Sequence, residues 1–179
     1  MLREFALSII RILREHDHQA YLVGGCVRDL LLGREPADYD VATSGTPNEV
    51  ANIFCDSYAV GAQFGVMLVP VPEEFGNGHG NHVVEVATFR SDIGYSDGRH
   101  PDQVRFTNVP REDAGRRDFT INGMMLEITE AGTLPDPITD GLKDYVGGRK
   151  DLEAGIIRAI GDPERRFSED KLRMLRAVR

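Results

Sequence analysis

The chain has 179 residues, of which 41% are hydrophobic, and this length suits one ordinary domain, or one domain and the beginning of another. No apolar run approaches the roughly 18 residues of a membrane span, and the N-terminus lacks the order of a signal peptide, so we expect a soluble cytoplasmic protein without a membrane partner. The formal net charge of -8 argues against a protein that binds nucleic acid with its whole surface. Cys26 and Cys55 lack the spacing of a zinc site or of a disulfide framework.

The first elements are expected to be scaffold. Apolar residues between Leu2 and Leu13 recur at spacings of three and four, which predicts an amphipathic helix. Residues 20–23 form a short apolar run that indicates a buried strand. A short helix is expected over residues 27–32, because Gly33 is a typical residue just past a helix end.

Two neighbouring features, a glycine pair and an aspartate pair, are candidate phosphate-binding and metal-binding sites. Gly24 and Gly25 stand between the apolar run and the expected helix, where backbone N-H groups without a nearby Cβ can approach a phosphate. Asp38 and Asp40 flank Tyr39, and on a strand the period of two puts both carboxylates on one face and Tyr39 on the other. Because Mg2+ prefers one or two carboxylates plus phosphate oxygens, the pattern suits a nucleoside triphosphate bound as its magnesium complex and indicates nucleotidyl transfer.

The middle of the chain alternates between expected strands and loops. Thr46, Pro47 and Glu49 give the capping signals of a helix over residues 47–55. The strand expected over residues 64–71 is nearly continuously apolar, which predicts a central position in the sheet. Strands are expected over residues 58–60, 64–71, 82–90 and 104–107, and loops over residues 72–81 and 91–102.

Glu85 is an acidic residue among apolar neighbours on the expected strand over residues 82–90. The period of two places it on one face with Val83, Ala87 and Phe89. An acid on such a face, near two aspartates, is a candidate third metal ligand. An acid at a strand end, or one in an ion pair between strands, is the alternative, and both interpretations stay open.

Basic residues accumulate toward the C-terminus. Residues 1–110 carry 8 Lys or Arg and 15 Asp or Glu, whereas residues 111–179 carry 13 and 14. Most of the later basic residues are Arg, whose planar guanidinium suits phosphates and base edges. We therefore expect any surface that faces RNA to begin in this part of the chain.

The C-terminal third supplies the remaining expected elements. Arg116 to Gly123 are expected at a helix start, and strands are expected over residues 124–128 and 156–160, with turns between 136 and 148. Gly161, Asp162 and Pro163 predict the start of one helix, and Ser168 with Glu169 and Asp170 predicts the start of another. The last helix lacks a C-terminal capping signal, so we expect a longer protein.

Four segments follow one another in the chain: GGCVRDLLLG with DYD, EVATFR, RRDFTING, and GDPERRFSEDKLRMLRAVR. In this order they resemble the class II tRNA nucleotidyltransferase and bacterial poly(A) polymerase family. The resemblance implies an α+β fold, a polymerase-beta-type nucleotidyltransferase head with a mixed or antiparallel sheet and flanking helices, over residues 1–154. The beginning of a helical neck would follow over residues 155–179, with the body and tail domains outside this chain.

The resemblance also implies the catalytic residues and the cofactor. Asp38, Asp40 and Glu85 would be catalytic, and the two aspartates would bind two Mg2+ ions. One ion would lower the pKa of the primer 3'-hydroxyl, and the other would stabilise the leaving pyrophosphate.

The nucleotide-binding residues come from the same resemblance. Gly25, Arg28 and Arg117 would contact the triphosphate. Asp118 and Asn122 would contact the ribose. Asp170 and Arg173 lie three apart, which on a helix makes them neighbours that can offer an acceptor and a donor to one base edge. The implied nucleotide-binding set is Gly24, Gly25, Arg28, Arg117, Asp118, Asn122, Asp170, Arg173, Arg176 and Arg179.

The implied reaction is transfer of CMP and AMP from CTP and ATP to a tRNA 3' end. Residues 97–101 resemble the loop of family members that add the terminal A, which implies CCA or A addition. A bacterial poly(A) polymerase is the first alternative, disfavoured because Ala62 and Gln63 stand before Phe64, where those enzymes tend to have a basic pair. A regulatory nucleotide-binding module without catalysis is the second, disfavoured by the presence of both aspartates. The oligomeric state stays open.

Overall fold

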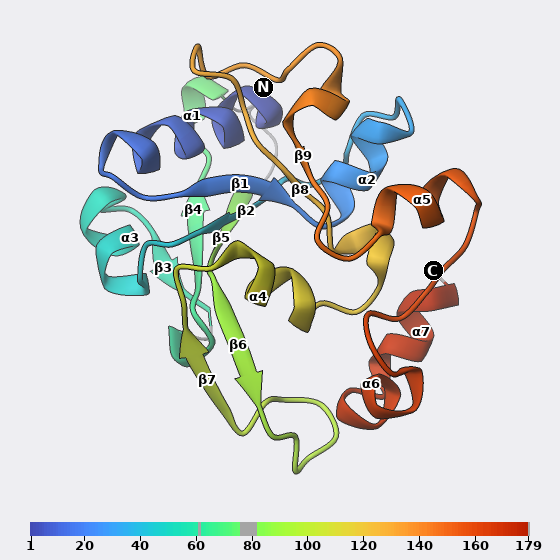
Figure 1. The fold of residues 1–179 in the computed structure, drawn as a ribbon. Helices are drawn as coiled ribbons and strands as arrows, with labels where there is room; N and C mark the ends of the chain where they lie inside the picture. Colours follow the sequence, from blue (N-terminus) through green and yellow to red (C-terminus); the bar gives the residue numbers. More distant parts are fainter. Residues whose placement is uncertain (61, 76–81, 179) are drawn as a thin grey trace.

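The structure is a computed structural model that describes residues 1–60, 62–75 and 82–178. Its centre is a seven-stranded sheet with helices on both faces, which confirms the predicted α+β class (Figure 1). The β2–β5 pair runs parallel, and the other described neighbours run antiparallel. In spatial order the strands are β3 (Tyr58–Ala59), β4 (Val66–Pro70), β5 (Val83–Thr88), β2 (Asp40–Thr43), β1 (Ala20–Val23), β8 (Met125–Leu126) and β9 (Leu142–Lys143).

Helices cover the two faces of the sheet unequally. The larger hydrophobic core contains side chains of α1, α2 and α3, whereas a smaller cluster on the opposite face includes Ala114 of α4. Val41 faces the larger core and Ala42 the smaller, as the period of two requires. The helices are α1 (Leu2–Glu15), α2 (Gly25–Leu31), α3 (Pro47–Ile53), α4 (Pro110–Arg116), α5 (Gly148–Glu153), α6 (Pro163–Glu169) and α7 (Leu172–Val178).

Several expected elements are confirmed by the capping and burial that they show. In α1 the residues Ala6, Ile9, Ile10 and Leu13 are fully buried, as the apolar repeat predicts. Thr46 and Glu49 form a reciprocal capping box at the start of α3. Within the described part of the chain, every helix is too short or too polar to cross a lipid bilayer.

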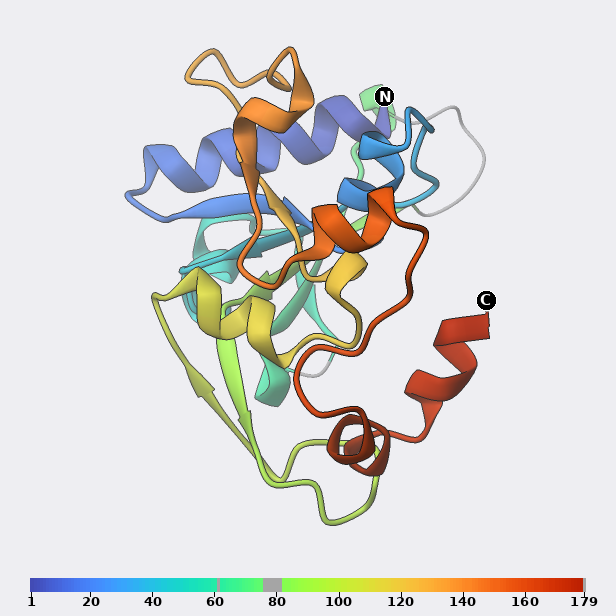
Figure 2. The same cartoon turned by 45° about the vertical axis from the view of Figure 1, so that its right-hand side comes forward.

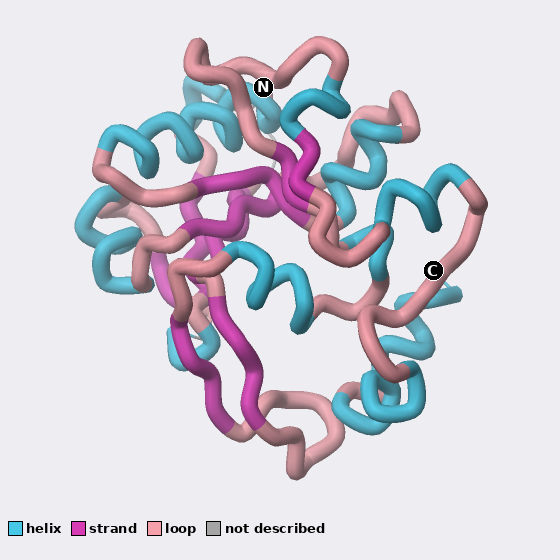
Figure 3. Tube along the Cα trace, viewed as in Figure 1, coloured by secondary structure: helices cyan, strands magenta, loops and turns pink. Residues whose placement is uncertain are grey.

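The expected loop over residues 91–102 is partly a β-hairpin. Strand β6 (Arg90–Ile93) pairs with β7 (Gln103–Phe106), so only residues 94–102 connect them. Figure 3 shows this hairpin projecting from the main sheet, with its turn near α6. None of the residues in β6 or β7 is buried, and only β7 alternates polar and apolar residues, so this two-stranded sheet carries a weak sequence signal.

Other expectations about the sheet are wrong. Strand β4 lies second from the edge rather than at the centre, because continuous apolar character reports burial and not strand order. Residues 156–160 form no strand beyond a single bridge between Phe119 and Ala159, and Ile156 and Ile157 are exposed. The expected loop over residues 72–81 contains one short 3-10 helix, Glu73–Phe75, and residues 76–81 lie outside the described residues.

The C-terminal part consists of two short helices beyond α5. Figure 2 shows an extended segment between α5 and α6, with α7 turning back beside it. Asp162 caps α6 by accepting a hydrogen bond from the Arg165 N-H at 3.0 Å, which confirms the predicted helix start. The chain then breaks at Asp170 before α7 begins.

Candidate active site

A cavity of about 940 Å³ lies where the β1–α2 junction, β2, β5, α4 and the C-terminal helices meet. The structure brings into its wall every predicted site residue that it describes. Arg179 lies outside the described residues. The predicted residues that line the cavity are Gly24, Gly25, Arg28, Asp38, Asp40, Glu85, Arg117, Asp118, Asn122, Asp170, Arg173 and Arg176.

Gly24 makes the tight entry into α2. Its φ of 76° and ψ of -139° lie in a region that essentially only glycine adopts without strain. A Cβ at this position would lie 3.5 Å from Asp40 Oδ2 and 3.6 Å from Arg117 Nη1. The glycine therefore brings the backbone close to both charged groups, and its role as a phosphate seat stays a prediction.

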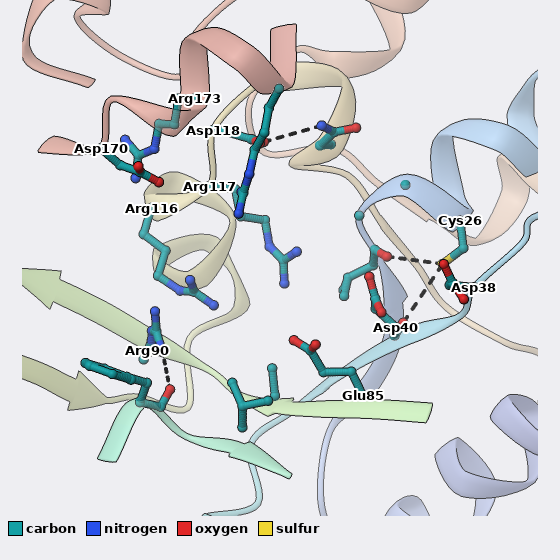
Figure 4. A pocket seen from close by; sticks show the side chains of 18 of the residues that line it. Cys26, Asp38, Asp40, Glu85, Arg90, Arg116, Arg117, Asp118, Asp170 and Arg173 are labelled. Carbon is teal, nitrogen blue, oxygen red and sulfur yellow. Dashed lines mark hydrogen bonds and ion pairs between the residues drawn. The ribbon is translucent and has the colours of Figure 1, made fainter. Parts of the chain in front are cut away.

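The acidic side of the cavity holds Asp38, Asp40 and Glu85 (Figure 4). Asp40 begins β2 and stands in register beside Glu85 on β5. Burial, reinforced by the Glu85 and Asp38 charges, raises the pKa of Asp40 to about 6, although Arg117 acts to lower it. Such crowding of carboxylates favours a bound cation, which would relieve their repulsion.

The strand predicted around the aspartates begins later in the structure than expected. Asp38 lies in a bend before β2, not within it. The predicted alternation is nevertheless confirmed, because Tyr39 and Val41 are buried in the larger core while Asp38 is exposed. Tyr39 also fixes the bend, since its hydroxyl donates to Glu35 at 3.0 Å and accepts from Arg3 at 3.1 Å.

Carboxylate oxygens are hard ligands, so the donor chemistry of this side fits a divalent cation such as Mg2+. Among residues 1–60, 62–75 and 82–178, however, no three His, Cys, Asp or Glu side chains form a group that could hold a metal ion. A cation here would therefore depend on the two aspartates and on oxygen ligands from a substrate. The role of Glu85 as a third ligand stays a prediction.

The basic side of the cavity is organised by Asp113, a residue that the sequence interpretation missed. Asp113 is fully buried in α4, and its Oδ1 accepts from Arg116 Nε at 2.9 Å. Its Oδ2 accepts from Arg117 Nη2 at 2.9 Å and from Arg117 Nε at 3.2 Å. Burial acts to raise the pKa of Asp113, but Arg117 and Arg116 hold it below its usual value.

This arrangement also corrects the predicted place of the RRDFTING segment. The two arginines lie at the end of α4 rather than at a helix start, and a 3-10 helix, η3 (Thr120–Asn122), follows. The sequence signals for α4 are Pro110 in its first turn and Asp113, which stands three residues before Arg116 and four before Arg117.

A polar network joins the two residues predicted to contact the ribose. Arg28 Nη1 donates to Asn122 Oδ1 at 2.9 Å, and Asn122 Nδ2 donates to Asp118 Oδ1 at 3.4 Å. Arg176 of α7 lies 3.4 Å from Asp118 Oδ2. The network connects α2, η3 and α7 around one end of the cavity.

Asp170 and Arg173 both line the cavity, but they do not share one helix face as predicted. Asp170 follows the last residue of α6 as its C-cap, and its Oδ1 accepts from the Leu172 N-H at 2.9 Å. Arg173 lies on α7, is 6% exposed, and donates from Nη1 to Glu169 Oε2 at 3.0 Å. Its guanidinium lies 5.9 Å from the centre of the Tyr95 ring. Sequence reasoning missed Glu169 and Tyr95 as partners of this arginine.

The turn of the β6–β7 hairpin closes the cavity beside the C-terminal helices. Asp97 accepts hydrogen bonds from the backbone N-H groups of Arg99 and His100 at 2.8 and 2.7 Å. The Gly98 carbonyl accepts from the Lys171 N-H at 3.3 Å, which links the turn to the segment before α7. The His100 ring stacks at 6.0 Å on Phe64.

Comparison with known proteins supports the assignment that the motifs suggest. The CCA-adding enzyme of Geobacillus thermodenitrificans is 44% identical over 174 residues, which is 97% of this chain and 39% of that enzyme. The CCA-adding enzyme of Bacillus subtilis is 42% identical over 175 residues, with the same coverage of each. This chain therefore spans 39% of the length of these curated relatives.

Solved structures agree with this result. A crystal structure of the Bacillus stearothermophilus CCA-adding enzyme in complex with CTP matches with a TM-score of 0.76 at 38% identity, covering 99% of this chain and 39% of that one. The Thermotoga maritima CCA-adding enzyme complexed with tRNA matches with a TM-score of 0.69 at 26% identity, covering 97% and 36%. The family described as the poly A polymerase head domain matches residues 20–158, and this chain belongs to that family.

Proposed function

We propose that this chain is the catalytic head of a cytoplasmic tRNA nucleotidyltransferase that transfers CMP and AMP from CTP and ATP to a tRNA 3' end and releases pyrophosphate. The observation that carries the proposal is the single cavity that joins a carboxylate cluster, a set of arginines and the residues predicted to read the base. Identity of 44% to a CCA-adding enzyme supports it.

The carboxylate side would hold the metal ions. Asp38 and Asp40 would bind two Mg2+ together with triphosphate oxygens, and Glu85 would add negative charge beside them. When bound, the ions supply activation of the primer 3'-hydroxyl and stabilisation of the leaving pyrophosphate, so no side-chain general base is required.

The triphosphate would lie between the carboxylates and the arginines. The backbone around Gly24 and Gly25 offers N-H groups to phosphate oxygens, and Arg28 and Arg117 supply positive charge. Asp118 and Asn122 would contact the ribose, while Asp170 and Arg173 would face the base edge. Figure 4 shows Arg116 and Arg117 across the cavity from Asp40 and Glu85, a separation of charge that suits a magnesium triphosphate between them.

The domain division is part of the same proposal. Residues 1–154 would form the head and residues 155–179 the beginning of a neck, a division supported by the end of α5 at Glu153. The relatives are longer than this chain, so most contacts to tRNA would lie in the parts of the relatives that this chain does not match.

Gly24→Ala is expected to weaken both folding and nucleotide binding. The backbone conformation of Gly24, with φ 76° and ψ -139°, costs an alanine about 1 to 3 kcal/mol, and the new methyl group would stand between Asp40 and Arg117. Gly33→Ala is the matched control, because Gly33 also has a positive φ but lies outside the cavity. Thermal melts should show similar losses for both variants, whereas calorimetric titration with Mg-ATP should show weaker binding for Gly24→Ala alone. Equal ATP affinities would contradict the proposed phosphate seat.

The product pattern tests the proposed reaction. A tRNA that lacks its terminal CCA is incubated with the chain, Mg2+ and each nucleoside triphosphate, separately and together. Addition of CC with CTP, and of CCA when ATP is also present, would support the proposal. A long run of A would indicate a poly(A) polymerase. Nucleotide binding without any addition, in this chain and in a version extended to the length of the relatives, would indicate a regulatory module.

A further inference from the structure

Arg117 is held by a carboxylate that lies outside the predicted set. Two of its three guanidinium nitrogens, Nε and Nη2, donate to Asp113 Oδ2. The third, Nη1, points toward Gly24, whose Cβ position would be 3.6 Å away, and it has no hydrogen-bond partner among residues 1–60, 62–75 and 82–178. Asp113 thus occupies one edge of the guanidinium and leaves the other facing the cavity.

The environment of Asp113 suits a fixed support. It is fully buried, and it accepts from three residues of the basic side: the backbone N-H of Arg90 at 3.3 Å, and the side chains of Arg116 and Arg117. Contact from several fixed donors leaves this carboxylate little freedom to turn. Because two nitrogens of Arg117 donate to the same carboxylate oxygen, the contact sets the orientation of the guanidinium as well as its charge.

Without Asp113, Arg117 would have a competing partner. Asp40 Oδ2 and Arg117 Nη1 lie 3.5 and 3.6 Å from the same Gly24 Cβ position, so Asp40 is a close carboxylate on the cavity side of this guanidinium. Its charge, like that of Asp118, acts on Arg117. A free guanidinium would turn toward Asp40, where it would occupy the space of a cation and leave the phosphate side. Arg116 would add repulsion, because it is the adjacent arginine on the same carboxylate and would then be compensated by the more distant Asp92, at 4.0 Å.

We propose that Asp113 is a positioning residue for nucleotidyl transfer: it holds Arg117 away from Asp40 so that Nη1 faces the triphosphate. This inference rests on the proposed function, because it assigns Arg117 to a phosphate. Asp113 itself is not among the residues that line the cavity.

The first experiment observes Arg117 in the free protein. In an arginine-labelled 1H–15N NMR spectrum, the Arg117 Nε-H signal is assigned by its loss in Arg117→Lys. We expect a sharp, slowly exchanging signal in the parent protein, and an averaged or missing one in Asp113→Asn. Asp151→Asn is the matched control, since Asp151 is a buried carboxylate that accepts from Arg158 Nε at 2.9 Å outside the cavity. An unchanged signal in Asp113→Asn overturns the proposal.

The second experiment tests whether Asp113→Asn weakens the contacts to the outer phosphates of the nucleotide. Binding of ATP and of AMP, each with Mg2+, is measured by calorimetry. Asp113→Asn should weaken ATP binding by about tenfold or more and AMP binding by less than about twofold, because a lost charge-assisted contact affects the outer phosphates. Asp151→Asn should leave the ratio unchanged, and Asp113→Asn should add nothing in an Arg117→Lys background. Equal weakening of ATP and AMP overturns the proposal.

A folding defect would not prevent the test. If Asp113→Asn fails to fold, the double variant Asp113→Asn, Arg116→Gln removes one charge of each sign and takes its place in both experiments. A parent protein that binds ATP no better than AMP would overturn the proposed function and the phosphate role of Arg117 with it. The NMR result would then still decide whether Asp113 orients Arg117.

Discussion

Asp40→Asn is expected to lower the rate of nucleotide transfer by at least about a hundredfold while leaving the protein folded. An amide is a poor substitute for a carboxylate that must neutralise and hold a divalent cation. The same is expected for Asp38→Asn, and a smaller loss for Glu85→Gln, which stands beside the pair on β5. The rate is measured as incorporation of labelled CMP into a tRNA that lacks CCA, with Asp140→Asn as an exposed carboxylate control outside the cavity.

Asp40→Asn should preserve or raise the stability of the protein although it lowers the transfer activity. The pKa of Asp40 is raised to about 6 by burial and by Glu85, so the folded protein ionises this carboxyl less readily than the unfolded chain, whose value is near 3.9. The raised pKa therefore lowers the free energy of unfolding. This loss of stability is absent below about pH 4, grows between pH 4 and 6, and is complete at pH 7. Asp40→Asn should therefore melt at an equal or higher temperature than the parent at pH 7 without divalent ions, and the gain should vanish near pH 4.

These two measurements separate a functional carboxylate from a structural one. A functional site that stores unfavourable charge gains stability when the charge is removed and loses activity. A large drop in melting temperature would show that Asp40 supports the fold. Full transfer activity in either aspartate variant would remove the two-metal proposal.

The chemistry was predictable where it depends on residues close in sequence. The glycines before α2 and the aspartates around Tyr39 form local patterns, and the structure brings them into one cavity. The burial of Tyr39 follows from the period of two, although Asp38 lies before the strand. Local periodicity is sufficient for such features, because the neighbouring backbone alone decides which way each side chain points.

The missed features depend on contacts between distant segments. Asp113 matters because the backbone N-H of Arg90 and the two arginines converge on it, and sequence spacing indicates only its neighbours on α4. The break at Asp170 was missed because SEDKLR suits a continuous helix, whereas the side chain of Asp170 instead caps α7. The strand predicted over residues 156–160 is absent: the prediction took Ile156 and Ile157 as buried apolar residues, whereas both are exposed.

Base selection is expected to depend on Asp170, and Asp170→Ala should relax selectivity toward UTP and GTP more than it lowers the maximal rate. CTP and ATP offer an exocyclic amino donor beside a ring-nitrogen acceptor, whereas UTP and GTP offer a carbonyl in place of that amino group. In the structure, Oδ1 of Asp170 already accepts from the Leu172 N-H, which leaves Oδ2 as the acceptor for a base. A carbonyl there would set acceptor against acceptor, at a cost of about 1 to 3 kcal/mol in a half-buried position.

Arg173 would supply the complementary donor. Its Nη1 is engaged by Glu169 and by the Arg166 carbonyl, so the guanidinium is held in place while other N-H groups remain for the ring nitrogen. Arg173→Ala should therefore weaken the use of both CTP and ATP, because both bases present that acceptor.

Steady-state kinetics with all four nucleotides measure both effects, and Asp162→Ala provides the matched control. Asp162 also caps a helix, by accepting from the Arg165 N-H at 3.0 Å, but it lies outside the cavity. Both aspartate variants should lose about 0.5 to 2 kcal/mol of stability with the lost cap, so a difference in selectivity between them belongs to the base and not to the fold. An Asp170→Ala enzyme that rejects UTP and GTP as strongly as the parent would overturn the assignment of Asp170 as the acceptor that reads the base.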